Sequence, residues 1–389
     1  MAIDPLATGL TVAAASPLIK GVIEKHVFTK IDKWLERAST QKKLVQHGFV
    51  NKLAEHLEQM YAKHTYIKTI ALQEQKTKLS DIYIPLTVTA KLYNPSTKST
   101  STVIYTLDHT PFNLVDEHEK IMIIDSAGMG KSTIAKHMFI SCVDNNYAIP
   151  VLIELRKVKA GRGIVEYIIS EFNSIQEKAD PDFILSLIAR GDFLFIFDGY
   201  DEISTSDKES VVSDIHNFVA KAGKNKYILT SREDPSLTSF SGFQNFRVRP
   251  LEAADAYDLI RKYDRTGAVA EQLISELDNP QLVAVQEFLR NPLLTSLLYR
   301  AYSYKQTVPV KKPTFYRQVF DALYNFHDVT KEGAYIREKK SKLEIEDFHR
   351  ALRAVGFLSM RSGKVEYSRD EIIRIIQDAK KTLRWRAIY

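Results

Sequence analysis

The chain has 389 residues, 44% of them hydrophobic and 26% charged, which is the composition of ordinary globular domains and the length of two or three of them. Its 15 glycines and 13 prolines exclude a collagen-like or low-complexity chain. Cys142 is the only cysteine, so an internal disulfide and a cysteine-rich zinc module are excluded. A chain without disulfides fits a reducing compartment, and we expect the protein to be cytoplasmic.

Residues 1–79 are predicted to form a helical domain that serves as an effector or in oligomerisation. Leu53, Leu57, Met60 and Tyr61 recur at helical spacing and give the segment a single apolar face. The segment holds 12 Lys and Arg against 7 Asp and Glu, a net charge of +5 out of +6 for the chain. Such a domain could contact nucleic acid, an anionic membrane or an acidic partner, although a solvated helical surface explains the same charge.

Residues 5–23 are the most apolar stretch near the N-terminus. Only 11 of these 19 residues are apolar, and Pro17 and Lys20 interrupt them, so the stretch does not predict a transmembrane helix. No secretory signal is predicted either, because Asp4 stands where a basic region would be needed. A helix that lies at a membrane interface is the membrane hypothesis that remains.

Residues 80–118 are predicted to be a linker with an edge strand. The segment Asp81–Val88 is strand-like, but Pro85 cannot donate a ladder hydrogen bond and so confines it to a sheet edge or an extended linker. The following segment, Asn94–Thr102, is polar and low in complexity, which predicts a mobile loop.

Between residues 119 and 250 the pattern changes to apolar strands that alternate with helices. Such alternation predicts an α/β fold with a parallel sheet covered by helices on both faces. The predicted strands are Ile121–Ile124, Pro150–Leu155, Phe193–Phe197, Tyr227–Thr230 and Phe246–Val248. The predicted helices lie near residues 131–142, 165–188 and 208–222, with a further one after Asp234.

Beyond Pro250 the chain is predicted to be helical again. We expect a helical subdomain at residues 251–310 and a winged-helix-like or second helical subdomain at residues 311–389. The expected helices are Leu251–Tyr263, Glu271–Asn279, Gln281–Tyr304 and residues 314–328, followed by a helical unit over residues 343–380. Ser368 followed by Glu371 is a capping-box pattern at the start of the last helix.

The strongest motif is the run DSAGMGKST at residues 125–133, which follows a predicted strand and precedes a predicted helix. This is the context of a phosphate-binding P-loop. Gly128 and Gly130 allow the backbone to wrap around phosphates, and the N–H groups at the helix start then face the anion. The residues expected to bind nucleotide in this loop are Ala127, Gly128, Met129, Gly130, Lys131, Ser132 and Thr133.

Within this loop Lys131 can bring a positive charge to the β- and γ-phosphates, and the hydroxyl of Ser132 can bind Mg²⁺. The full P-loop pattern has a glycine at the position of Asp125. The first bend of the loop is therefore the portion of the motif that departs from the pattern.

A second motif, FLFIFDGYDE at residues 193–202, is an apolar strand that ends in acids. Asp198 at the strand tip could hold Mg²⁺ through water, and Gly199 leaves room beside the phosphates. Asp201 or Glu202 could orient and polarise the attacking water. Because open α/β sheets bind ligands at the carboxyl ends of their strands, we expect this motif to lie beside the P-loop.

Two further observations support a hydrolytic site. Asp198 follows Lys131 by 67 residues with one predicted strand between them, which is typical of the P-loop group with a catalytic acid on the second motif strand (ASCE). The next strand ends at Arg232, whose guanidinium could stabilise the γ-phosphate or could simply pair with a neighbouring acid. The catalytic candidates are Glu202, Asp201, Lys131 and Arg232.

Five segments together resemble NACHT-domain proteins, a branch of the STAND ATPases: GMGKST, FLFIFDGYDE, YILTSRED, FRVRPLEAADAYDLI and NPLLTSLL. Gly199 with the acid pair after it is similar to NACHT more than to other AAA-like ATPases, and the DSAGMG form of the loop resembles the bacterial branch. The resemblance covers roughly residues 80–380. It implies an AAA-like P-loop NTPase core at residues 119–250.

The resemblance also implies a switch that binds ATP or ADP with Mg²⁺. NACHT proteins hold ADP in a closed monomer, exchange it for ATP when a trigger binds, and then oligomerise; many bacterial members act in antiphage defence. On that pattern Pro292 would line the adenine pocket, although a proline also fits the first turn of a helix. A winged-helix histidine of the family contacts the β-phosphate, and His327 and His349 are both candidates for it.

We therefore expect a slow Mg-dependent ATPase whose hydrolysis regulates a signalling switch in bacterial antiphage immunity. The partners expected are further copies of the chain and a trigger, which could be a ligand or a phage protein. Two alternatives stay open. One is a membrane-acting or toxic effector with the NTPase as its trigger, and the other is an AAA-type remodelling ATPase with steady turnover.

Overall fold

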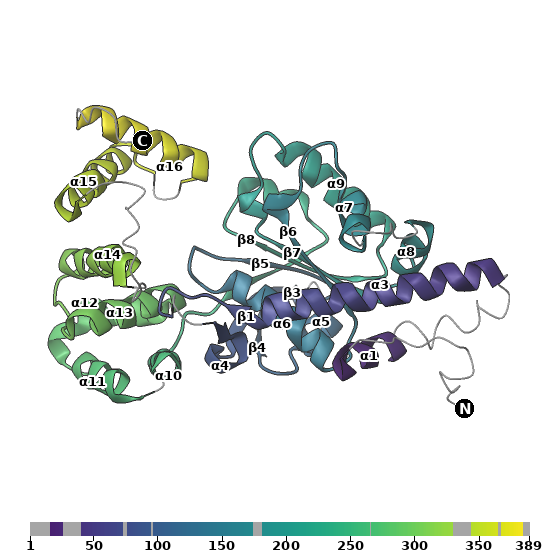
Figure 1. Ribbon diagram of the computed structural model, residues 1–389, viewed down its shortest axis with the longest axis horizontal. Coiled ribbons are helices and arrows are strands. Elements are labelled where there is room, and N and C mark those ends of the chain that lie inside the picture. The colour runs from purple at the N-terminus through teal and green to yellow at the C-terminus, as the bar shows by residue number, and fades with distance from the viewer. Residues whose placement is uncertain are drawn as a thin grey trace. The chain divides into compact units, whose positions relative to one another are not determined.

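The computed structural model describes residues 16–25, 40–72, 76–94, 96–173, 181–264, 266–329, 344–364 and 367–383. The chain divides into two units. The first comprises residues 1–270 and 287–296, and the second comprises residues 271–286 and 297–389. A seven-stranded sheet flanked by helices forms the core of the first unit (Figure 1).

The sheet has the strand order β4-β3-β9-β5-β8-β7-β6. The strands from β9 to β6 are parallel to one another, whereas β3 is antiparallel to both β9 and β4. The predicted α/β fold with a largely parallel sheet is confirmed, and so are the five strands predicted after residue 119. The strands are β3 (Leu86–Asn94), β4 (Ser99–Leu107), β5 (Lys120–Ile124), β6 (Ile149–Glu154), β7 (Phe193–Asp198), β8 (Lys226–Ser231) and β9 (Gln244–Val248).

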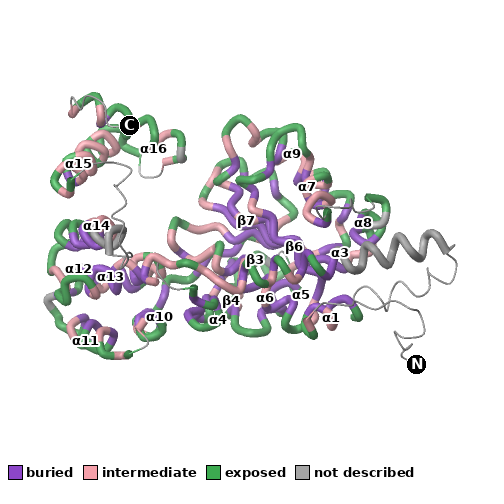
Figure 2. The backbone as a smooth tube through the Cα atoms, in the orientation of Figure 1, coloured by how far each residue is buried: buried purple, intermediate pink, exposed green. Residues whose placement is uncertain are grey.

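The central strands are apolar because helices cover both of their faces. In β7 the residues from Phe193 to Phe197 are at most 1% exposed, and the rings of Phe193 and Phe195 stack with centroids 5.4 Å apart. Figure 2 shows β6 and β7 within the buried interior of this unit. An uninterrupted apolar run is what a strand buried on both faces requires. Asp198 ends the run, so the first polar group of this strand lies at its carboxyl end.

The helices between the parallel strands lie on opposite faces of the sheet. The chain passes from β5 across to β6 through α6 (Lys131–Asp144), then returns to β7 and β8 in the opposite direction. Right-handed crossovers therefore place α6 on one face and the helices of the return path on the other, as Figure 1 shows. The helices of the return path are α7 (Ile164–Glu171), α8 (Pro181–Ile188) and α9 (Lys208–Lys221). The single helix expected over 165–188 is thus two helices, and residues 174–180 lie outside the described residues.

Up to Thr65 the described residues of the N-terminal segment are mostly helical, but a short antiparallel pair follows within the segment that was predicted to be helical to residue 79. Helix α1 (Pro17–Ile23) packs against α3 (Thr40–Thr65) and α6, with Ile19, Val22 and Ile23 at most 1% exposed. The apolar character of residues 16–23 is thus explained by packing inside the unit. Residues 5–15 of the same apolar stretch lie outside the described residues. The pair that follows is β1 (Tyr66–Ile67) with β2 (Thr77–Lys78). No described helix has the length and apolar character needed to cross a membrane.

Two predictions for residues 80–118 are wrong. Residues 79–82 form the helical turn α4 (Leu79–Ile82), and β3 begins only after Pro85. The polar run expected as a loop instead enters β4 at Ser99, because threonine is β-branched and packs well across an antiparallel ribbon. The hydroxyls of Thr87 and Thr106, which face each other across this ribbon, lie 3.3 Å apart. After β4 the chain forms α5 (Phe112–Glu117).

Beyond Pro250 the described residues are mainly helical, as predicted, and two helix predictions after residue 232 need correction. The segment after Asp234 is only a 3-10 turn, Pro235–Ser239. The helix expected over 281–304 is broken at Pro292, which begins a new helix because proline fits the first turn but lacks an N–H for the interior. The capping box of Ser368 and Glu371 is confirmed. The helices are α10 (Ala253–Tyr263), α11 (Ala268–Leu277), α12 (Val283–Gln286), α13 (Pro292–Lys305), α14 (Lys312–Val329), α15 (Ile345–Arg361) and α16 (Arg369–Thr382).

Two histidines of α3 are buried in the first unit. His56 and His64 are 7% and 2% exposed, and burial lowers the pKa of each to about 4. The ring of His64 lies 5.2 Å from that of Phe139 on α6, and its Nε2 has no hydrogen-bond partner among the described residues. The charged groups around His64 are Lys63, Lys136, Lys157 and Glu154. Since the unfolded chain binds protons at these histidines at higher pH than the folded one, the free energy of unfolding falls as the pH decreases from about 6.5 toward 4.

We predict that His64→Leu weakens this pH dependence. Leucine removes the titrating group together with a buried, unpartnered nitrogen, so the Tm at pH 7 should stay close to that of the wild type. Between about pH 7 and pH 5 the Tm of the variant should then decrease less. Circular dichroism melts across this range measure the effect, with His109→Leu at an exposed position as the control. Parallel Tm curves for the wild type and His64→Leu would contradict the prediction.

Candidate functional site

The loop between β5 and α6 depends on two glycines. Gly128 and Gly130 have φ values of 82° and 90°, in the left-handed region that favours glycine. A Cβ on Gly130 would lie 2.7 Å from Cδ1 of Leu86, so this position also lacks room for a side chain. Gly130 is the N-cap of α6 and no side chain caps this helix. The first N–H groups of α6 are therefore available to an anion.

Asp125 stands where the full P-loop pattern has a glycine, and the structure explains why an aspartate fits. Its φ is not positive, because the described non-glycine residues with positive φ are Lys98, Asn146 and Gln306. Its Oδ1 accepts a hydrogen bond from the N–H of Ser126 at 2.8 Å, and its Oδ2 accepts one from the N–H of Val248 at 3.0 Å. Asp125 thus ties the start of the loop to β9.

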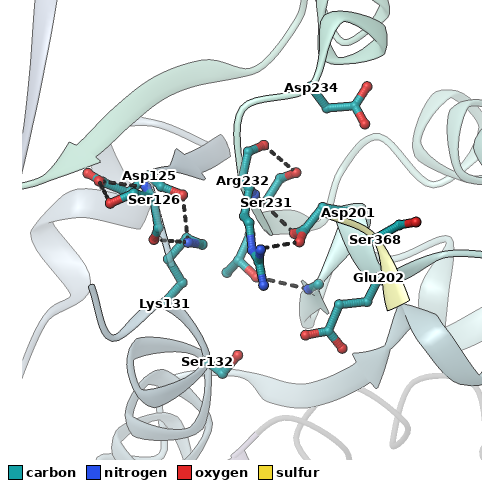
Figure 3. A network of polar contacts seen from close by, with 12 residues as sticks. Asp125, Ser126, Lys131, Ser132, Asp201, Glu202, Ser231, Arg232, Asp234 and Ser368 are labelled. Carbon is teal, nitrogen blue, oxygen red and sulfur yellow. Dashed lines mark hydrogen bonds and ion pairs between the residues drawn. The ribbon is translucent and has the colours of Figure 1, made fainter. Parts of the chain in front are cut away.

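Lys131 folds back over the loop that precedes it. Its Nζ donates hydrogen bonds to the backbone carbonyls of Asp125 and Ser126, both at 2.7 Å (Figure 3). The ammonium group is therefore held at the loop by neutral acceptors. A phosphate, which carries full negative charge, is a stronger partner for an ammonium than a carbonyl.

The two sequence motifs meet at Ser132 and Asp198. The hydroxyl of Ser132 donates to Oδ1 of Asp198 at 3.1 Å. The same Oδ1 accepts a hydrogen bond from the hydroxyl of Thr230 at 2.6 Å, and Thr230 in turn accepts one from the N–H of Gly199 at 3.0 Å. Thr230 is 1% exposed and lies in β8, between β5 and β7 in the sheet. This chain of contacts fixes the carboxylate of Asp198 beside the loop.

The acid pair after β7 divides into two roles. Asp201 holds Arg232: its Oδ1 accepts from the backbone N–H of Arg232 at 3.0 Å, and its Oδ2 lies 3.1 Å from the Nε of that side chain. Figure 3 shows these two side chains against each other at the strand tips. Asp201 is therefore occupied in positioning Arg232. The alternative interpretation, in which Arg232 pairs with the next acids along the chain, does not hold, since Glu233 pairs with Arg247 and Asp234 with Lys208.

Glu202 has a single ion-pair partner among the described residues, the guanidinium of Arg156, at 3.2 Å. Both side chains are well exposed, at 43% and 58%, so solvent weakens the pair. Burial, together with the carboxylates of Asp198 and Asp201, raises the pKa of Glu202 above its ordinary value even though Arg156 opposes the shift. A carboxylate with a raised pKa is a better proton acceptor, so of the two acids Glu202 is the one suited to act as a general base.

The phosphate loop and the residues after β7 and β8 line a cavity of about 490 Å³ in the first unit, whereas Asp198 and Arg156 are not among its lining residues. Most of the predicted nucleotide-binding residues line it, as do Asp201, Glu202 and Pro292. Met129 does not: it is 6% exposed, and its sulfur lies 3.4 Å from the side-chain amide of Asn291. The predicted residues that line the cavity are Ala127, Gly128, Gly130, Lys131, Ser132, Thr133, Arg232 and Pro292.

The residues around Asp198 fit Mg²⁺ by their chemistry. Ser132 and Asp198 offer a hydroxyl and a carboxylate oxygen, the hard ligands that Mg²⁺ prefers, and this ion usually takes its other ligands from water and phosphate. The described residues contain no group of three or more His, Cys, Asp or Glu that could hold a metal alone. The site therefore suits an ion that arrives with a nucleotide.

Three residues of the site were not among the sequence candidates. Thr230 interrupts the apolar run of β8, and Asn291 precedes the proline that begins α13, so each had a local signal. Arg156 had none, because nothing in its surroundings along the chain distinguishes it from a surface arginine.

Of the two candidate histidines, neither is placed at the cavity. His349 belongs to the second unit, where its Nε2 lies 2.7 Å from Oδ1 of Asp321. The side chain of His327 lies outside the described residues of the structure.

The solved structures that are similar to the chain are all distant from it. RuvB, the Holliday junction branch migration motor of Thermotoga maritima, is 12% identical over 69% of this chain and 88% of its own, with a TM-score of 0.32. Cdc6p from Pyrobaculum aerophilum is 12% identical over 72% and 80% of the two chains, with a TM-score of 0.35. A chain of the Drosophila ORC bound to DNA is 11% identical over 70% and 71%, with a TM-score of 0.32. These similarities are too distant to carry an argument about function.

The family comparison is more specific. No curated protein matches the chain significantly. The family model of the NACHT domain matches residues 119–266, which contain the loop, the acidic strand end and Arg232. Together with the P-loop NTPase fold, this match identifies residues 119–266 of the chain as a NACHT domain.

Proposed function

We propose that the chain is a slow Mg-dependent ATPase that acts as an ATP/ADP-operated switch and oligomerises when ATP is bound. The observation that carries the proposal is the contact between Ser132 and Asp198, which joins the P-loop to the acidic strand end at 3.1 Å beside one cavity. A nucleotide and its metal need both motifs at one place. The glycine-rich loop, Lys131, the hydroxyl of Ser132 and the carboxylate of Asp198 all lie there.

Each residue has a distinct role in the proposed reaction. The N–H groups at the start of α6 and the ammonium of Lys131 bind the phosphates, while Ser132 and Asp198 hold Mg²⁺. The metal ion, when bound, neutralises charge on the phosphates. Glu202 would accept the proton of the attacking water, and Arg232, which lines the same cavity, would stabilise the terminal phosphate by its positive charge.

Three charged groups of the cavity have protein partners that a bound nucleotide and its water would have to replace. Lys131 is bound to backbone carbonyls, Arg232 to Asp201, and Glu202 to Arg156. A hydrolysing site needs these groups directed at the nucleotide and the water, so at least some of these contacts have to be exchanged first. The preference for a slow switch over a continuously cycling motor rests on the resemblance to NACHT proteins and not on these contacts.

The further elements of the proposal rest on the resemblance to NACHT proteins. They are self-association on activation, a trigger ligand or phage protein, and a role in bacterial antiphage defence. The alternative of a membrane-acting effector has less support, since the described portion of the apolar stretch near the N-terminus packs inside the first unit. The alternative of an AAA-type remodelling ATPase shares the same site and differs in turnover and assembly.

We predict that Lys131→Ala weakens nucleotide binding by about tenfold or more, because a charge-assisted contact to the phosphates is lost. Titration calorimetry with ADP and Mg²⁺ measures the Kd. Lys136→Ala is the matched control, since this lysine lies on the same helix but does not line the cavity. An unchanged Kd in Lys131→Ala would remove the loop from the proposed site.

We predict that Glu202→Gln keeps nucleotide affinity but lowers the rate of ATP hydrolysis by about 100-fold or more, the usual effect of removing a general base. Because only the ionised carboxylate accepts a proton, the wild-type rate should fall as the pH decreases through the raised pKa of Glu202. A phosphate-release assay measures both effects, with the exposed Glu209→Gln as the control. Hydrolysis by Glu202→Gln at the wild-type rate would show that another group is the base.

The proposed oligomerisation has its own test. Glu202→Gln with ATP should give a larger mass by light scattering than the same variant with ADP, because hydrolysis no longer returns it to the resting state. One mass in both nucleotides would contradict a nucleotide-operated assembly. A wild-type turnover of several per second without any trigger would instead favour the remodelling ATPase, since regulated P-loop switches are much slower.

A further inference from the structure

The start of α13 is hydrogen-bonded to the backbone of the phosphate loop. The side-chain amide of Asn291 donates a hydrogen bond from Nδ2 to the carbonyl of Ala127 at 3.2 Å. The backbone N–H of Leu293 donates to the carbonyl of Gly128 at 3.2 Å. Two consecutive carbonyls of the loop are therefore held by α13.

The same asparagine also caps α13. Its Oδ1 accepts hydrogen bonds from the N–H of Leu294 at 3.2 Å and from the N–H of Leu293 at 2.9 Å, which is the arrangement of an N-cap. The N–H of Leu293 is thus shared between Oδ1 of Asn291 and the carbonyl of Gly128, and the contact with Asn291 is the shorter one. One side-chain amide thus uses its oxygen for the helix and its nitrogen for the loop. The helix start and the loop conformation are coupled through a single residue.

Contact between the two segments is also close. A Cβ on Gly128 would lie 2.7 Å from Cβ of Leu293 and 2.8 Å from Oδ1 of Asn291. The loop therefore packs directly on the start of α13 at Gly128, whose carbonyl is one of the two that α13 holds. Any outward movement of the loop requires α13 to move as well.

Peptide geometry gives these contacts a consequence inside the cavity. In a trans peptide the C=O of one residue and the N–H of the next point in opposite directions. Holding the carbonyl of Ala127 toward α13 therefore directs the N–H of Gly128 away from α13, and holding the carbonyl of Gly128 does the same for the N–H of Met129. A peptide that turned over would present a carbonyl to the phosphates in place of a donor.

We propose that Asn291 is a positioning residue that keeps the phosphate loop in its donor-inward conformation and thereby sets the rate at which nucleotide leaves. The inference deepens the proposed function and rests on it. Helix α13 continues to Lys305, beyond residue 296 where the first unit ends. Displacement of the start of α13 would release both carbonyls at once and allow nucleotide exchange.

The test compares two substitutions of one side chain. Asn291→Asp keeps an acceptor for the helix cap but loses the donor to Ala127, and Asn291→Ser keeps a capping hydroxyl that is too short to reach the loop. Both should accelerate dissociation of a fluorescent ADP analogue about three- to tenfold, the effect of one net hydrogen bond. Stopped-flow displacement by excess ADP measures the rate in the full chain, with the exposed Asn113→Asp as the control.

The unfolding temperature without nucleotide separates positioning from a structural role. Because both variants keep a cap, this temperature should stay close to that of the wild type while the dissociation rate rises. Wild-type dissociation rates in both variants would overturn the proposal, as would a rate increase in Asn291→Asp alone that high salt abolishes, since charge repulsion would then explain it. If the wild type bound no ADP, the proposed function itself would fail, and this inference with it.

Discussion

The site depends on one hydroxyl, that of Thr230, at the carboxyl edge of a sheet that is buried on both faces. It donates to Asp198 and accepts from the N–H of Gly199, so it fixes the acid of β7 from the neighbouring strand β8. Since β8 lies between β5 and β7, this contact places the acid next to the loop that follows β5. A shift of β8 by one residue would turn Thr230 to the opposite face of the sheet and release Asp198.

Charged side chains at the same edge of the sheet are compensated by partners within the chain. Three charged groups that face the cavity have partners in the chain: carbonyls for Lys131, Asp201 for Arg232, and Arg156 for Glu202. These partnerships differ in strength. Asp201 holds Arg232 through both backbone and side chain, whereas the pair of Glu202 and Arg156 is solvent-exposed and weak. Glu202 is therefore the charged group that is released most easily for the reaction.

Patterns that are local in sequence predicted most of the fold. The five parallel strands and α6 were readable because buried strands and the glycine loop leave short, strong signals. The hairpin of β3 and β4 was missed because its serines and threonines read as a loop, and only the pairing with β3 across the ribbon makes them a strand. In the site, the P-loop and the acids were predicted from their motifs. The different contacts of Asp201 and Glu202, and the hydrogen bond from Asn291 to the loop, could not be predicted because they join residues that only the fold brings together.

The central claim is that the cavity beside Ser132 and Asp198 is a nucleotide site that keeps its ligand in the resting protein. Denaturing the purified protein and separating the released small molecules by chromatography tests it directly. We expect the released material to contain ADP in an amount close to that of the protein. Protein that releases no nucleotide, and that also fails to bind added ADP or ATP with Mg²⁺, would contradict it.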